Sequence, residues 1–321
     1  MATKTTPITS PKLAHRASWF DLRGLIRELQ RHTFVLLIGI VLPLFLYAVF
    51  MAYPIIRTIM LSFYKWNGIS PTMQYYGLQN YVDLVEDKFF LLTLGNNIKW
   101  AILTLILPVG GGLLLAVFLQ SGKVYFPEFF RTMFFLPATM SLVMVGLMFA
   151  LILNPAFGGL NEALKALGLG FLIQDWLGNA KIAIYVLIVV FGWYYIGMPM
   201  ILFYAGIAEI PTELFEEATL QGANGWQTLR HVTFPLLRPV TIVVTAQAVI
   251  QSLKAFDIVM TMTQGGPYNS TSVLGYYMYK QTFWTAHYGY GAAISVVILA
   301  LSGIFAVLYL RQVAGESSYG E

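Results

Sequence analysis

Long apolar stretches alternate with shorter polar ones along most of this chain of 321 residues. A helix needs about 20 mostly apolar residues to cross the hydrocarbon core of a bilayer. Six stretches meet that length, at residues 34–53, 98–119, 133–153, 182–203, 240–260 and 292–310. The pattern predicts an all-α fold, a polytopic transmembrane helical bundle of about six spans.

Helix-breaking residues lie inside four of these spans, at Pro43, Pro108, Pro137 and Pro199. Membrane helices tolerate proline where neighbouring groups satisfy the freed backbone, and small residues such as those at 110–112 allow helices to approach closely. Ordinary kinks and packing account for each of these residues taken singly.

The segments between the spans predict no soluble domain. We expect a tail at residues 1–33, a membrane domain at 34–311 containing a polar loop at about 209–238, and a short tail at 312–321. Segments 67–97, 155–180 and 261–291 hold polar and aromatic residues with Gly and Pro, which indicates loops with short surface helices.

Composition agrees with a surface that faces lipid. Only 11% of the residues are charged and 58% are hydrophobic, with a mean hydropathy of +0.69, whereas a soluble domain carries about 25% charged residues. The N-terminal tail concentrates positive charge, which favours its retention in the cytoplasm. Its basic residues are Lys4, Lys12, Arg16, Arg23, Arg27 and Arg31. Six spans would return the C-terminus to the same side of a plasma membrane.

The sequence lacks the residue patterns that several classes of function require. The four histidines are too far apart for a zinc site, carboxylates avoid the middles of the spans, and no GxxxxGK[ST] phosphate loop occurs. We therefore expect neither a catalytic residue nor a metal or cofactor in this chain, and we read the basic tail as a topology signal rather than a nucleic-acid site.

A polar stripe runs along the predicted fifth span. Gln247, Gln251 and Lys254 follow at helical steps of four and three, and Asp257 lies three residues further on. Lys254 and Asp257 would share one helix face, either as an interfacial ion pair or as part of a substrate path. Amides suit neutral hydroxylated ligands better than anions, which call for arginine.

Aromatic residues lie within the predicted fourth span at Trp193 and Tyr194. Flat rings stack on the apolar faces of sugars while their polar edges form hydrogen bonds. Core packing is the alternative for this pair.

The stretch EEATLQGANGWQTLRHVTFPL, from Glu216 to Leu236, is polar in an otherwise apolar chain. We expect a helix to begin at Thr212 as N-cap, with the acids Glu213, Glu216 and Glu217 on one face. A patch of small residues follows at Ala218, Gly222 and Ala223, and Pro235 leads back into a span. This arrangement predicts an element that docks into another subunit.

These residues resemble the cytoplasmic EAA loop of binding-protein-dependent ABC importer permeases. That pattern reads Glu-Ala-Ala, three residues, Gly, nine residues, Ile, one residue, Leu-Pro. Here Glu216 and Gly222 take the Glu and Gly places, Val232 the Ile place, and Phe234-Pro235 the Leu-Pro place, with departures at Glu217 and Gln221.

The resemblance extends over almost the whole chain after the tail. YPIIRTIMLSFYKW, GLQNYVDL, RTMFFLPATMSLVMVGLMFALILNP and FDIVMTMTQGGPYNST are similar to the carbohydrate-uptake permeases, such as the maltose and glycerol-phosphate systems. The resemblance implies the type I ABC importer permease fold and alternating access driven by ATP.

It also implies the partners. These are a second permease subunit forming a heterodimer with this one, two copies of an ABC ATPase that bind ATP and Mg, and an extracytoplasmic solute-binding protein that delivers a sugar. The segment from Glu216 to Gly222 would be the coupling helix.

Three alternatives stay open on the sequence. Cargo such as glycerol phosphate or another polyol derivative would need cationic pathway residues, for which Lys254 is the candidate. A stand-alone secondary transporter would leave the EAA pattern unexplained, and a membrane enzyme would need a pair of acids or histidines.

Overall fold

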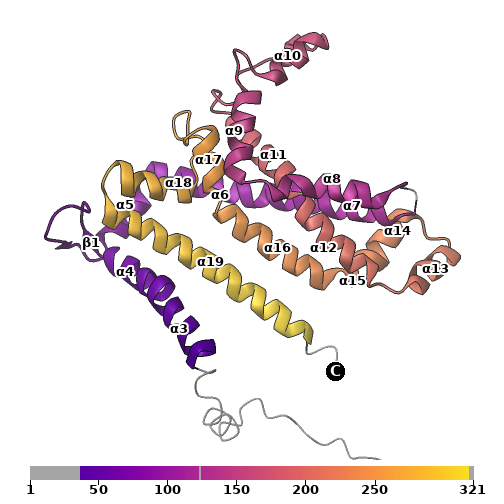
Figure 1. The fold of residues 1–321 in the computed structure, drawn as a ribbon, viewed down its shortest axis with the longest axis horizontal. Coiled ribbons are helices and arrows are strands. Elements are labelled where there is room, and N and C mark those ends of the chain that lie inside the picture. Colours follow the sequence, from indigo (N-terminus) through magenta and orange to yellow (C-terminus); the bar gives the residue numbers. More distant parts are fainter. Residues whose placement is uncertain (1–36, 123, 318–321) are drawn as a thin grey trace, which may run out of the picture. The chain divides into compact units, whose positions relative to one another are not determined.

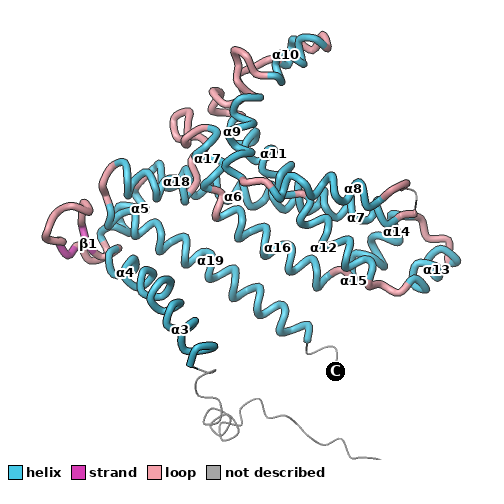
Figure 2. The backbone as a smooth tube through the Cα atoms, in the orientation of Figure 1, coloured by secondary structure: helices cyan, strands magenta, loops and turns pink. Residues whose placement is uncertain are grey.

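The computed structural model describes residues 37–122 and 124–317, and helices make up most of it (Figures 1 and 2). The tail predicted at residues 1–33, Lys123 and the last four residues lie outside the described residues. The chain divides into two compact units, Met1–Arg57 and Thr58–Glu321.

The described part of the first unit belongs to one apolar helical span, Ile38–Leu61, whose last turns enter the second unit. Its consecutive elements are η1 (Leu37–Val41), α3 (Leu42–Tyr47), η2 (Ala48–Ala52) and α4 (Tyr53–Leu61). Phe45 and Phe50 are both exposed, and no residue of α3, η2 or α4 is buried. A helix that is apolar all round needs an apolar environment, so this span requires lipid or another chain around it.

The second unit begins with a short hairpin and a long span. Strands β1 (Tyr64–Lys65) and β2 (Gln74–Tyr75) pair antiparallel, with Tyr64 opposite Tyr75. Helix α5 (Gln79–Glu86) follows, and α6 (Lys88–Thr104), η3 (Leu105–Gly110) and α7 (Gly111–Gln120) form the span Lys88–Gln120. Pro108 lies in η3, a π-helical stretch that lets the helix continue past a residue without an N–H.

Three further spans are bent helix pairs. Helix α8 (Pro127–Phe135) continues into the 3₁₀ stretch η4 (Leu136–Thr139), and the chain then turns by 95° into α9 (Leu142–Ile152). Figure 1 shows α9 leaving the line of α8. The pair α11 (Ala183–Tyr195) and α12 (Gly197–Ala208) bends by 43°. Pro199 explains this bend, because proline has no N–H to donate to the preceding turn.

The remaining elements complete the bundle. A 77° bend separates the helical stretch Gly225–Leu236 from α16 (Arg238–Leu253). That stretch consists of α14 (Gly225–Thr228), η6 (Leu229–Thr233) and α15 (Phe234–Leu236). The others are α10 (Gly159–Ala166), η5 (Gly170–Leu172), α13 (Thr212–Leu220), α17 (Phe256–Met262), α18 (Leu274–Tyr279), η7 (Lys280–Trp284) and α19 (Tyr288–Ser317).

The described residues thus contain three long candidate spans, or up to six if each bent pair crosses once. Each of the six overlaps one predicted stretch, with different ends, and the short surface helices expected between spans are α5, α10 and α18. The second span begins earlier than predicted, at Lys88 instead of residue 98, because the Asp87 carboxylate caps it by accepting from the Phe89 N–H.

The fifth span corrects the prediction of one helix over residues 240–260. Helix α16 ends at Leu253, and α17 begins at Phe256 after a turn in which the Phe256 N–H donates to the Lys254 carbonyl. Lys254 and Asp257 therefore do not share the face of one continuous helix.

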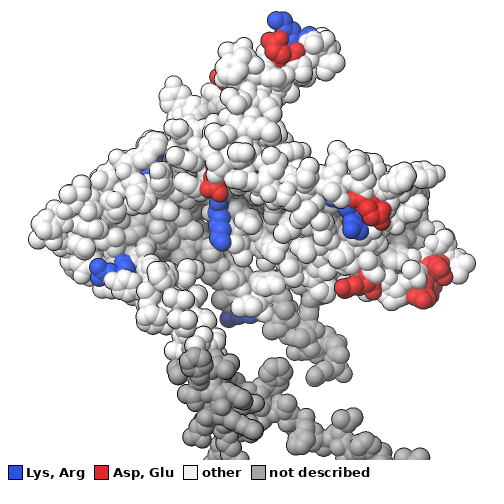
Figure 3. Space-filling view, viewed as in Figure 1, with Lys and Arg blue, Asp and Glu red and all other residues white. Residues whose placement is uncertain are grey.

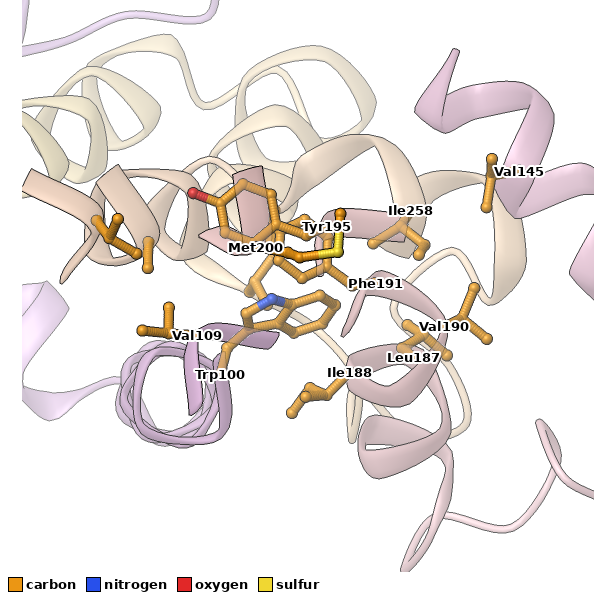
Figure 4. Close-up of a cluster of buried hydrophobic side chains, with 14 of the residues drawn as sticks. Trp100, Val109, Val145, Leu187, Ile188, Val190, Phe191, Tyr195, Met200 and Ile258 are labelled. Carbon is orange, nitrogen blue, oxygen red and sulfur yellow. The ribbon is translucent and has the colours of Figure 1, made fainter. Parts of the chain in front are cut away.

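An aromatic cluster lies at the centre of the buried core (Figure 4). The Trp100 ring of α6 meets the edge of Phe191 at 5.7 Å between centroids, and Phe191 stacks on Tyr195 at 5.5 Å. Such pairs contribute about 0.5–1.5 kcal/mol beyond the area they bury. The cluster joins the second span to the fourth.

Helices α7 and α12 approach each other closely at Gly112. A Cβ built on this glycine would lie 2.8 Å from the Met200 backbone nitrogen and 2.8 Å from the Pro199 Cβ. Because one of these atoms belongs to the backbone, only glycine fits at this crossing.

We expect Gly112→Ala to destabilise the subunit by about 1–3 kcal/mol through overpacking, measured as a lower Tm in detergent. Gly95→Ala is the matched control, since a Cβ on Gly95 meets nothing within 4 Å and alanine favours helix. Equal Tm values for the two variants would contradict the close crossing.

Candidate functional site: an acidic helix and a broken polar span

The acidic segment forms α13, and its start differs from the prediction. Pro211 takes the N-cap position, and Thr212 is the first helical residue. Glu213 lies in the first turn, where the helix dipole favours an acid. Glu217 accepts a hydrogen bond from the Gln221 amide at 3.2 Å, so Gln221, a departure from the EAA pattern, supports the helix itself.

Gly222 ends this helix instead of lying within it. Its φ is +79°, a conformation that glycine adopts without strain. The Ala223 N–H donates to the Ala218 carbonyl and the Gly222 N–H to the Thr219 carbonyl, both at 3.0 Å. This pair of bonds is a Schellman motif, in which a left-handed residue satisfies the last carbonyls of a helix. A Cβ on Gly222 would meet nothing within 4 Å, so its φ, not lack of space, requires glycine.

Helix α14, which follows, is capped at its N-terminus by its own residues. The Asn224 side chain accepts from the Gln227 N–H at 2.9 Å, and the Gln227 side chain accepts from the Asn224 N–H at 2.8 Å. This reciprocal pair is a capping box. It fixes the start of α14, two residues after the glycine that ends α13.

The residues predicted to dock differ in how far their side chains are exposed. Glu213, Glu216, Glu217, Gly222 and Pro235 are exposed, and Ala223 is half-buried. Ala218 is buried, which corrects its assignment to the outward patch. Acidic atoms gather over the α13 end of the face in Figure 3, and most of that face is uncharged.

The sequence analysis missed the apolar part of this surface. Leu220 is 88% exposed at the end of α13, and Trp226 is 66% exposed in α14. These two side chains add exposed apolar area to the segment that carries the acids. Their position within an acidic segment was the signal available in the sequence.

The polar stripe of the fifth span lies on an outer face. Gln247, Gln251 and Lys254 are exposed, whereas Ala248 and Ser252 between them are buried. Both amides belong to α16, and Lys254 caps its end. The stripe is thus present on the helix up to the break.

The aromatic candidates lie near the other side of that break. Tyr194 belongs to α11 and Asp257 to α17, two helices that pack against each other. Trp193 is partly exposed and meets the edge of Phe149 at 5.3 Å. The structure therefore places Tyr194 and Asp257 on neighbouring helices, while Trp193 shares its ring contact with α9.

Two buried amides hold the break in place, and the sequence analysis did not single them out. Asn97 donates to the Ser252 carbonyl at 3.0 Å and accepts from the Leu274 N–H at 2.7 Å. Asn96 donates to the carbonyls of Ser270 and Ser272 at 2.8 and 2.9 Å. Adjacent asparagines inside an apolar run were the only signal in the sequence.

The chain is similar to known membrane transport proteins. Residues 109–314 match the family described as binding-protein-dependent transport system inner membrane component. The chain is 37% identical over 270 residues to a probable ABC transporter permease of Pyrococcus horikoshii, covering 83% of this chain and 91% of the relative.

The names of two other relatives state the class of molecule that their systems transport. A multiple sugar-binding transport system permease of Streptococcus mutans is 36% identical over 275 residues, covering 85% and 92% of the two chains. An arabinooligosaccharides transport system permease of Bacillus subtilis is 33% identical over 270 residues, covering 83% and 84%.

A solved structure shares the fold. A chain of a bacterial ABC transporter involved in the import of the acidic polysaccharide alginate superposes with a TM-score of 0.77 at 22% identity, covering 91% of this chain and 98% of that one. The fold and the acidic helix thus define a multi-pass membrane permease of an ABC importer. This chain belongs to the binding-protein-dependent transport system inner membrane components.

Replacing Asn97 tests its part in the broken span. We expect Asn97→Leu to lower stability by about 2–3 kcal/mol, because the buried Ser252 carbonyl and Leu274 N–H lose their partner. Thermal unfolding in detergent measures this. Ile98→Ala, an exposed position on the same helix, should change Tm little, and an equal loss in both variants would contradict the assignment.

Proposed function

We propose that this chain is one of two permease subunits of an ATP-driven importer for a sugar or oligosaccharide. An external solute-binding protein delivers the cargo, and two ATPase subunits drive alternating access. The observation on which this rests is α13, a short acidic helix that is exposed and fixed at its end by Gly222.

Helix α13 would be the coupling helix. Its acids and Leu220 would enter a cleft of the ATPase, which binds ATP and Mg, and the capping box at Asn224 would transmit the movement to α14 and the fifth span. This assignment puts α13 and both chain termini in the cytoplasm of a prokaryote, in line with the basic tail.

The exposed stripe of Gln247 and Gln251 would face the pathway shared with the second permease, with Lys254, Asp257 and the Tyr194 phenol near the break. Amides and a phenol suit neutral hydroxyl groups, whereas an anionic cargo calls for several cations. The sugar and arabinooligosaccharide permeases among the relatives support the same class of cargo.

Gly222→Val tests the coupling helix. A β-branched residue at a φ of +79° costs about 1–2 kcal/mol and distorts the Schellman motif. We expect uptake into proteoliposomes to fall at least tenfold while the assembled complex still hydrolyses ATP. Gly225→Ala is the control, because its φ is not positive and a Cβ there meets nothing. Unchanged uptake by Gly222→Val would refute the coupling role.

The double variant Gln251→Ala, Lys254→Ala tests the pathway. We expect a changed KM or a changed preference among sugars, with ATPase subunits still bound, because these side chains would contact cargo. Gln174→Ala, an exposed amide outside the span, serves as control. Wild-type uptake kinetics for every sugar would remove both residues from the pathway.

A further inference from the structure

Two adjoining cavities lie beside the β1–β2 hairpin, in the second unit and apart from the fifth-span stripe. Their volumes are about 350 and 600 Å³, and they share Lys65, Trp66 and His287 as lining residues. Small-molecule sites occupy about 300–1,000 Å³. The lining residues come from the segment after the first span and from residues 281–290, which lead into the last span. With six crossings, these segments lie on the membrane side opposite the loop that carries α13.

The walls of these cavities are held by hydrogen bonds to the backbone. The N–H groups of Tyr288 and Gly289 donate to the Trp66 carbonyl at 3.0 and 3.5 Å. Asn80 donates to the carbonyls of Ser62 and Tyr64 at 2.7 and 3.0 Å. The Trp66 indole donates to the Ser70 carbonyl at 2.8 Å, which orients the ring before any ligand arrives.

Asp87, at the base of the smaller cavity, supports this wall and is not available as a ligand. Its Oδ2 accepts from the hydroxyls of Tyr277 and Tyr290 at 2.5 and 2.6 Å, and its Oδ1 accepts from the Phe89 N–H. Partial burial acts to raise the pKa of Asp87, but these hydrogen bonds outweigh it and keep the pKa below the usual 3.8. The carboxylate therefore stays charged and is saturated by these donors.

The side chains that remain carry both signs of charge and an aromatic ring. Asp83 offers a carboxylate of which one oxygen accepts from Gln79. Gln281 offers an amide whose Oε1 already accepts from the Thr285 hydroxyl, and Lys65 offers an ammonium group that lies 5.4 Å from the centre of the Tyr76 ring. In the described residues no group of three or more His, Cys, Asp or Glu residues is placed to hold a metal ion. Balanced charge, planar polar groups and Trp66 suit a neutral ring that bears hydroxyl groups.

We propose that these cavities bind sugar units of an oligosaccharide at the external face of the permease, separately from the path along the fifth span. Trp66 would stack on a ring, and Asp83, Gln281 and Lys65 would pair with hydroxyl groups. The site would hold the end of a longer cargo chain while another part enters the bundle. This inference rests on the proposed function for its ligand and its side of the membrane.

A binding experiment without the solute-binding protein tests the site directly. The probes are maltotriose and arabinotriose, with glycerol as a ligand without a ring, added to the assembled complex in nanodiscs and followed by saturation-transfer NMR. We expect trisaccharide binding that weakens about tenfold in Trp66→Ala and in Asp83→Asn, the loss of one strong contact. Lys65→Met, a change at an exposed side chain, replaces either variant that fails to assemble.

Matched controls lie on the same side of the protein outside the cavities. Tyr268→Ala removes an exposed aromatic ring, and Glu162→Gln removes an exposed acid. Both should bind the trisaccharides as the wild type does. Absence of saccharide binding in the wild type, or equal binding in the cavity variants and the controls, would overturn the proposed site.

Uptake measurements separate this proposal from the general one. With the binding protein added, the cavity variants should raise KM for trisaccharide uptake with kcat unchanged. If the wild type takes up sugar and the cavity variants match it in trisaccharide binding and in KM, the cavity site alone is rejected. A wild-type complex that takes up none of a panel of sugars would reject the sugar importer itself.

Discussion

A backbone N–H or carbonyl group without a partner is costly inside a membrane, so non-helical backbone persists there only where protein satisfies it. The turn between α16 and α17 meets this requirement through Asn97, which binds one carbonyl before the break and one N–H beyond the following loop. Asn96 binds two further carbonyls of that loop. The end of the polar stripe depends on these two buried amides.

The same amides connect distant parts of the chain. Asn96 and Asn97 belong to α6, the helix that also carries Trp100 into the aromatic cluster with Phe191. Movement of the fourth span against the second would therefore act on the break through one helix. Gly112 adds a second junction between the same two spans, where α7 and α12 nearly touch. The break between α16 and α17 is thus held by a helix that is itself packed against the fourth span.

The apolar pattern was sufficient to predict the six candidate spans, because segment length and hydropathy follow directly from bilayer thickness. It failed at residues 254–256, because whether a polar turn continues a helix depends on Asn97, which is more than 150 positions away. The spacing from Glu216 to Gly222 was enough to predict a docking segment that forms a short exposed acidic helix. It did not reveal that Ala218 faces inward or that Leu220 faces outward, because a short helix can be rotated without any change in spacing.

The hydrogen bonds of Asn96 and Asn97 all end on main-chain atoms of the break and the loop. Backbone atoms are the same whatever side chain a residue carries, except that proline has no N–H to replace that of Leu274. Substitutions at 251, 252, 254 or 270–274 therefore leave the partners of the two asparagines in place. Related permeases can therefore exchange the side chains around the break while they keep the hydrogen bonds that hold it, so the chemistry of this surface can change without a new scaffold.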